Sequence, residues 1–222
     1  SIASTSVART IVINPTEDEA TSALGAQVSG TAAEGSALTA SLTASDVDGS
    51  ITTAYQWQVN TGTSVAPVWA DITGATSASL SIASDQTYVD KQVRVVAETT
   101  DVLGGKTTFT GNPQLVANVD DAATSTLGVT VTGTRVEGTS LVANLTATDP
   151  DGTIISTSYQ WQINTAASGQ AAVWVNIPSV VVPTAVTAAL ALPNDHTYIG
   201  KQVRVVAETT DVLGGKTTFT GN

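Results

Sequence analysis

The sequence predicts an all-β chain made of two tandem β-sandwich domains, and three observations support this prediction. The stretch KQVRVVAETTDVLGGKTTFTGN at residues 91–112 recurs letter for letter at 201–222. Apolar and polar residues alternate with a period of two in many short stretches, as they do in half-buried strands. No stretch has a convincing helical period. A repeat of about 100 residues is long enough for each copy to build one core of its own.

The repeat extends well beyond the identical tails. Residues 28–50 match 131–153 at an offset of 103, YQWQ at 55–58 matches 159–162 at an offset of 104, and the tails match at 110. The two copies therefore differ in length in only a few loops. Because even the exposed positions of the tails are identical, we interpret them as the product of recent copying within a longer array.

The offsets set the expected domain boundaries. We expect a first repeat over 1–112, with 1–14 as a lead-in from a preceding repeat, and a second repeat over 113–222. The segment NPQLVANVDDAATSTLG is expected to be the linker between them, and the chain is expected to be a fragment of a longer protein.

The alternating stretches predict about seven short strands in each copy. Tyr55, Trp57 and Val59 alternate with glutamines, and Val93 and Val95 alternate with Gln92 and Arg94. Seven strands with a tryptophan on the third are typical of an immunoglobulin-like sandwich. The chain has no cysteine, so the tryptophan must pack against aliphatic side chains without the disulfide of antibody domains.

Composition limits the partners. The net charge is −11 and the isoelectric point is about 4.1, which argues against nucleic acid and anionic membranes as partners. No apolar stretch approaches the roughly 20 residues that span a bilayer, so we expect no membrane insertion. The opening SIASTSVARTIVIN lacks the basic start and apolar centre of a secretion signal.

Acidic residues gather on particular loops. In a seven-strand sandwich, the loops after strands two and six share one end with the N-terminus. That end carries Asp46, Asp48 and Asp101 in the first copy, and Asp149, Asp151 and Asp211 in the second. The acids of the N-terminal approach, among them Asp18, Asp120 and Asp121, belong to the same end, whereas Glu34 belongs to the opposite end.

Carboxylate oxygens in this number suit Ca²⁺, which takes six to eight oxygen ligands in flexible geometry. Asp and Gly are also ordinary turn residues, and a single Asp-x-Asp-Gly would be read that way. Its recurrence in both copies, together with acids on neighbouring loops, favours a calcium site.

Signals for an enzyme are weak. The one histidine, His196, aligns with Gln86 of the other copy, so a mechanism shared by the repeats cannot depend on it. Paired carboxylates can also serve a glycosidase, but that role needs a cleft with aromatic platforms. Trp69 and Trp174 are the only plausible exposed platforms, and packing at the core or an edge is the alternative for them. We therefore expect no catalytic activity.

The order EGSALTASLTASDVDGS, YQWQ, DITGATSASLSI and DKQVRVVAETTD resembles the tandem immunoglobulin-like, cadherin-like extender repeats of giant bacterial RTX adhesins, which are exported by type I secretion. The resemblance covers nearly the whole chain in both copies. It implies calcium between end-to-end domains. The implied ligands of the junction between the two copies are Glu34, Asp120, Asp121, Asp149, Asp151 and Asp211. The implied ligands towards a preceding repeat are Asp18, Asp46, Asp48 and Asp101.

The expected function is therefore a calcium-stiffened spacer that projects a distal binding region from a bacterial cell surface. Its expected partners are neighbouring repeats of the same chain, its expected location is extracellular, and it is expected to be monomeric. A glycan or surface ligand is expected elsewhere in the full protein. The alternative is a glycan- or surface-binding module of an extracellular adhesin.

Overall fold

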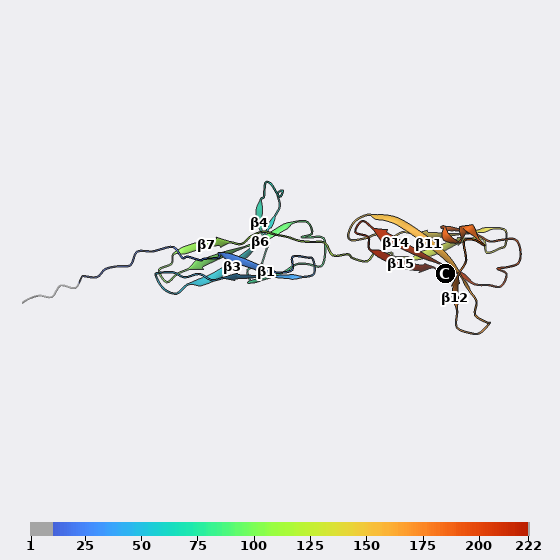
Figure 1. Cartoon of the computed structure of the whole chain (residues 1–222), viewed down its shortest axis with the longest axis horizontal. Coiled ribbons are helices and arrows are strands. Elements are labelled where there is room, and N and C mark those ends of the chain that lie inside the picture. The colour runs from blue at the N-terminus through green and yellow to red at the C-terminus, as the bar shows by residue number, and fades with distance from the viewer. Residues whose placement is uncertain (1–10, 222) are drawn as a thin grey trace, which may run out of the picture. The chain divides into compact units, whose positions relative to one another are not determined.

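The computed structural model describes residues 11–221, and the chain divides into two compact units, Ser1–Asn118 and Val119–Asn222 (Figure 1). Within the described residues every regular element is a β-strand, apart from one 3-10 helix, η1 (Pro183–Val186). The strands pair antiparallel into several sheets. The prediction of an all-β fold is confirmed, and the sheets are consistent with β-sandwiches.

The first unit has two facing sheets. Its strands are β1 (Ala26–Gly30), β2 (Ala37–Leu42), β3 (Thr52–Asn60), β4 (Trp69–Asp71), β5 (Ser79–Ser81), β6 (Gln92–Thr100), β7 (Lys106–Thr110) and β8 (Gln114–Leu115). One sheet has the order β1-β2-β5 and the other β4-β3-β6-β7, with β8 also paired to β6. This division of consecutive strands between two sheets is that of an immunoglobulin-like sandwich.

The second unit repeats the arrangement. Its strands are β9 (Val129–Gly133), β10 (Ser140–Leu145), β11 (Ile154–Asn164), β12 (Trp174–Asn176), β13 (Ala189–Ala191), β14 (Val203–Asp211) and β15 (Lys216–Gly221). The sheets have the orders β9-β10-β13 and β12-β11-β14-β15. Helix η1 lies in the longer connection from β12 to β13, where the second copy carries its insertion.

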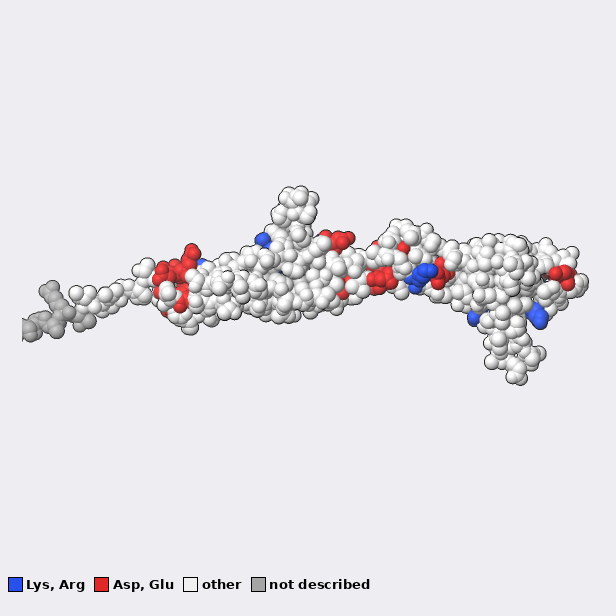
Figure 2. Space-filling view, in the orientation of Figure 1, with Lys and Arg blue, Asp and Glu red and all other residues white. Residues whose placement is uncertain are grey.

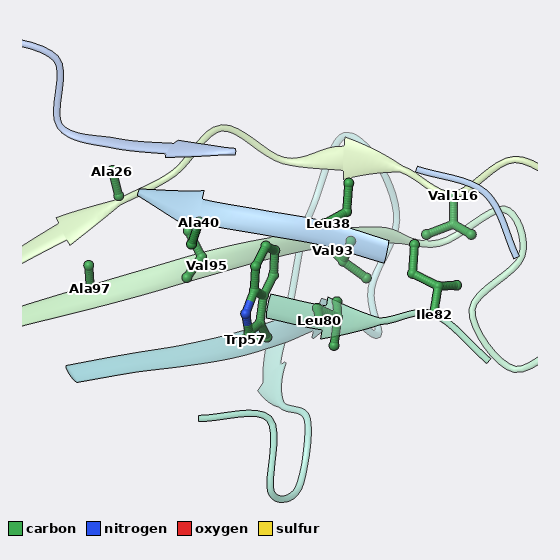
Figure 3. Packing of buried hydrophobic residues seen from close by; sticks show 10 residues of the cluster. All are labelled: Ala26, Leu38, Ala40, Trp57, Leu80, Ile82, Val93, Val95, Ala97 and Val116. Atoms are coloured by element: carbon green, nitrogen blue, oxygen red, sulfur yellow. The ribbon is translucent and has the colours of Figure 1, made fainter. Parts of the chain in front are cut away.

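A tryptophan lies at the centre of each core. Trp57 on β3 has no exposed surface, and its indole Nε1 donates to the carbonyl of Ser77 at 3.0 Å. Figure 3 shows it among aliphatic side chains of both sheets, including Leu80 and Val95. Trp161 is equally buried in the second unit. The expected packing of tryptophan against aliphatic side chains is therefore present without a disulfide.

The ends of each sandwich have distinct loops. In the first unit, the β2–β3 and β6–β7 loops flank the arriving chain, where Thr21 pairs with Ser45 and the Ala20 amide donates to Thr107 Oγ1 at 2.9 Å. We call this end the N-terminal pole. At the other end, the C-terminal pole, the β1–β2 and β5–β6 loops flank the departing chain, and Ala33 pairs with Ala117. The N-terminal pole of the second unit has the same construction.

Part of the expected linker is folded onto the first unit. Residues 113–118 belong to the first compact unit, which thus extends past residue 112, where the sequence repeat ends. Strand β8 pairs with β6, and Val116 is fully buried in the core. Backbone hydrogen bonds to Lys91 and Asp90 and the burial of Val116 together hold this short segment on the sandwich. Among the described residues, no helix is long and apolar enough to span a bilayer.

Candidate metal centre

Carboxylates converge at the N-terminal pole of the first unit. Carboxylate oxygens of Asp46, Asp48 and Asp101 lie within 4.8 Å of one another. Asp46 and Asp48 come from the β2–β3 loop, and Asp101 follows the last residue of β6. Figure 2 shows acidic side chains gathered where the extended approach meets this unit. Oxygen ligands at this spacing could hold a metal ion.

Backbone amides orient these carboxylates. Asp101 Oδ1 accepts from the amides of Leu103 at 2.6 Å and Gly105 at 3.1 Å. Asp46 Oδ1 accepts from the Asp48 amide at 2.8 Å, which closes the Asp-x-Asp-Gly turn. One oxygen of each group is thus occupied by the backbone, and the loop fixes the direction of the other.

The approaching chain supplies a further carboxylate, that of Glu17. A Cβ atom on Gly105 would collide with Glu17 Oε1 and Asp101 Oδ2, which therefore both lie against this glycine. The second glycine of DVLGGK thus gives two carboxylates room to approach each other. Any other residue at position 105 would displace one of them.

The second unit has a similar cluster at its N-terminal pole, in which Asp120, the counterpart of Glu17, takes part. Oxygens of Asp120, Asp151 and Asp211 lie within 4.8 Å of one another. Asp211 Oδ1 accepts from the amides of Leu213 and Gly215, and Asp149 Oδ1 accepts from the amide of Asp151 at 2.9 Å. The bonds match those of the first unit one for one. The cluster is thus a property of the repeat.

Neighbouring lysines are engaged elsewhere. Lys106 directly follows Gly105, but its ammonium group pairs with Glu98 at 2.6 Å, away from the cluster. Lys216 pairs with Glu208 at the same distance in the second unit. These two lysines leave the charge of the neighbouring carboxylates in place.

Proximity of like charges alters the proton affinity of the approaching acids. Removal from water, and next the negative charge of Asp101, raise the pKa of Glu17 above its ordinary value. Removal from water, and next the charge of Asp211, raise the pKa of Asp120 in the same way. Each cluster therefore favours uptake of a positive charge, whether a proton or a metal ion.

Stability without calcium should consequently increase as the pH falls from neutrality towards the ordinary carboxyl pKa of roughly 4. A carboxyl group with a raised pKa in the folded state binds its proton more tightly there than in the unfolded state. The resulting stabilisation is fully present below the unfolded-state pKa of roughly 4 and is lost as the pH rises through the raised folded-state pKa. We expect a higher melting temperature at pH 5 than at pH 7 in calcium-depleted buffer, measured by differential scanning calorimetry.

A matched variant isolates the cause. Glu17→Gln combined with Asp120→Asn should flatten this pH dependence. Hydrogen bonds from Thr87 and Thr197 lower the pKa of Asp85 and Asp195. The stability that these two carboxylates contribute is lost only below roughly pH 4, so they do not affect the measurement between pH 5 and pH 7. An unchanged pH dependence in the double variant would contradict the assignment.

The structure adds one carboxylate to the predicted set and shows a backbone contact for another member of that set, whose role as a ligand stays a prediction. Glu17, absent from the predicted ligands, borders the first cluster, whereas Asp18 contributes its amide, which donates to Asp48 Oδ2 at 2.7 Å. Glu17 corresponds to Asp120 at the offset of 103, so the alignment of the two copies could have identified Glu17 as a candidate ligand. The Asp121 amide donates to Asp151 Oδ2 in the same manner.

Glu34 lies at the C-terminal pole of the first unit, apart from Asp46, Asp48 and Asp101. It is 5% exposed, its amide donates to the Ala117 carbonyl at 3.2 Å, and its carboxylate accepts from Gln86 Nε2 at 3.4 Å. Its role as a ligand in a junction stays a prediction.

The two edge tryptophans have a cation on one face. The guanidinium carbon of Arg94 lies 4.1 Å from the centre of the Trp69 ring, and that of Arg204 lies 4.5 Å from Trp174. Both rings lie on short strands at a sheet edge and are partly buried. This stacking gives them a packing role.

Comparison with known proteins finds similarity among solved structures only. No family model and no curated protein matches the chain. The chain is similar to the structure of a Ca²⁺-stabilised adhesin that helps an Antarctic bacterium reach out and bind ice. The sequence identity is 14%, the TM-score is 0.36, and the match covers 91% of this chain and 48% of the other. This chain therefore spans about half the length of that one.

Proposed function

We propose that this chain is a calcium-stiffened extender segment of a large bacterial cell-surface adhesin, which holds a distal binding region away from the cell. The observation that carries the proposal is the recurrence of one carboxylate cluster at the N-terminal pole of both units. The extender acts mechanically and has no catalytic activity of its own.

The donor set selects the ion. Every proposed ligand is a hard oxygen donor on a loop, and Ca²⁺ accepts six to eight such donors at 2.3–2.6 Å in flexible geometry. Mg²⁺ requires stricter octahedral geometry and retains its waters. Extracellular calcium modules bind at about 10⁻⁴–10⁻³ M, so the clusters fill outside the cell and stay empty during export.

The path of the chain through one unit suits a spacer. The chain arrives at the N-terminal pole of the first unit, beside the cluster, and leaves at its C-terminal pole beside Ala33. A series of such units, each contacting only its neighbours, makes a quasi-one-dimensional array. In the proposal, Glu34 supplies a ligand to the cluster of the following repeat, and calcium stiffens the junction.

A glycan-binding module has less support. Sugar binding uses an open aromatic face, and Arg94 and Arg204 each cover one face of the edge tryptophans. The proposal therefore assigns any glycan or surface ligand to other parts of the full protein.

Small-angle scattering of the chain in millimolar calcium and in chelator tests the proposal. We expect the maximum dimension to increase with calcium and the distribution of dimensions to narrow. Asp149→Ala with Asp151→Ala should abolish this response, because it disables the cluster of the second unit. Asp46→Ala with Asp48→Ala is the matched control, since that cluster faces a preceding repeat, and it should retain the response. A calcium-independent scattering profile in the unaltered chain would overturn the extender proposal.

A further inference from the structure

One asparagine of the second unit stands in a sequence context that its counterpart in the first unit lacks. Residues 144–146 read Asn-Leu-Thr, the one Asn-x-Ser/Thr triplet of the sequence in which x is not proline, since the triplet at 14–16 reads Asn-Pro-Thr. Such a triplet is the acceptor for transfer of a sugar to an asparagine side chain. Residues 41–43 of the first copy read Ser-Leu-Thr, so the acceptor is particular to the second unit.

The fold presents this triplet on an accessible face. Asn144 lies on β10, the central strand of the sheet β9-β10-β13, and the side chains of Asn144 and Thr146 are both exposed. Side chains two residues apart on a strand point to the same face, and the residues between them, Ala143 and Leu145, pack towards the core. A transferase can therefore reach the asparagine amide and the threonine hydroxyl together while the sandwich stays folded.

The sandwich does not require an asparagine at this position. Asn144 Nδ2 donates two exposed hydrogen bonds, to Thr132 Oγ1 at 3.2 Å and to the Val142 carbonyl at 3.3 Å. A sugar replaces one of the two hydrogens on Nδ2, so one of these bonds can persist. Ser41 holds the equivalent place in the first unit, with the same pairing of the two strands. Modification of Asn144 is thus compatible with the fold.

A hollow of about 460 Å³ lies beside the asparagine. Its lining consists of Thr126, Leu127, Gly128, Thr130, Asn144 and Thr146. The volume falls in the range of sites that hold small molecules. The threonine hydroxyls can donate to and accept from the hydroxyls of a sugar, and Leu127, which is 80% exposed, offers an apolar surface to the C–H groups of its ring. The first sugar therefore has both room and matching partners.

We propose that Asn144 is an N-glycosylation site and that the hollow seats the first sugar, a hexose. A glycosyltransferase supplies the hexose as a nucleoside diphosphate sugar. The bond between C1 and the diphosphate oxygen breaks, C1 bonds to Asn144 Nδ2, one Nδ2 proton passes to a base of the transferase, and the nucleoside diphosphate leaves. The strands of this sheet carry no charged side chain, so the glycan keeps an uncharged face hydrated and covers Leu127.

Peptide mass spectrometry of the protein isolated from the cells that make it tests this proposal. We expect the peptide that contains Asn144 to carry one or more hexose residues, with fragmentation that places the first of them on the asparagine side chain. An unmodified Asn144, or sugars attached to threonine hydroxyls alone, would overturn the proposal.

Variants produced in the same cells show whether the triplet determines the site. Asn144→Gln and Thr146→Ala should each abolish the modification, whereas Thr146→Ser should retain it. Ser41→Asn is the matched gain, because it completes the triplet at 41–43 on the equivalent strand of the first unit, and it should add a second glycan of the same mass. Retention of the glycan in the Thr146→Ala variant would contradict the proposal. None of these residues belongs to a carboxylate cluster, so the calcium-dependent scattering should be unchanged and the extender proposal is judged separately.

Discussion

Asp211→Asn is expected to stabilise the second unit in chelator and to destabilise it in calcium. Asp211 is 3% exposed, and one of its oxygens already accepts two backbone amides. Asparagine can keep those hydrogen bonds through its side-chain oxygen and turn its amide nitrogen towards the Asp120 carboxylate. In the unaltered chain the negative charges of Asp120 and Asp211 repel each other. The variant therefore removes a repulsion and gains a hydrogen bond when no cation is present.

With calcium the sign reverses. A ligand that binds only the folded state stabilises it by about 2.7 kcal/mol at a concentration 100 times its Kd. Loss of a central carboxylate should remove most of this contribution. Calorimetric melts in chelator and in calcium should therefore cross, the variant melting higher than the unaltered chain in the first buffer and lower in the second.

Asp71→Asn is the matched control for the loss of one charge. Asp71 Oδ1 accepts from Gln58 at 2.8 Å on the sheet, and the second copy has Asn176 at this position with the same bond from Gln162. The control should behave like the unaltered chain in both buffers. Equal calcium stabilisation of the Asp211→Asn variant and the unaltered chain would show that the cluster does not bind calcium.

Local patterns were sufficient to predict the fold. The alternation in QVRVVAETT corresponds to alternating burial along β6, and YQWQ places Trp57 between the sheets. These signals are local, because the side chains of a strand point alternately to two faces. The Asp-x-Asp-Gly acids were found for the same reason: the turn that exposes them is encoded within four residues.

The remaining features depend on contacts between distant segments. Of Glu17, Asp18 and Glu19, the one that faces the cluster is set by how the approaching chain pairs with Ser45 and Thr107. No periodicity within that extended segment encodes this choice. The sequence predicts a linker at Val116 because a two-residue strand is too short to show alternation, and the burial of this side chain follows from the space left between the sheets.

Trp57→Ala should have the largest effect on folding, a loss of about 3–5 kcal/mol in the first unit. The side chain is fully buried, contacts both sheets, and its indole donates to the Ser77 carbonyl. Its removal leaves a cavity and an unsatisfied carbonyl in a core that has no disulfide. Since whole domains are stable by about 5–15 kcal/mol, the substitution should remove a large share of the stability of the first unit.

Urea unfolding followed by circular dichroism checks this result, with the second unit as an internal reference. The variant should show one transition at low urea for the first unit and one unchanged transition for the second. Trp161→Ala should give the mirrored result, since its indole donates to Thr187 at 2.9 Å in an equivalent core. Trp69→Ala is the control, because that ring lies at a sheet edge and its removal should lower the free energy of unfolding far less.

If Trp57→Ala and Trp69→Ala lowered the free energy of unfolding equally, Trp57 would not be the centre of the core. If Trp57→Ala lowered both transitions equally, the two sandwiches would unfold as one cooperative unit, and each repeat could not serve as an independent element of an extender.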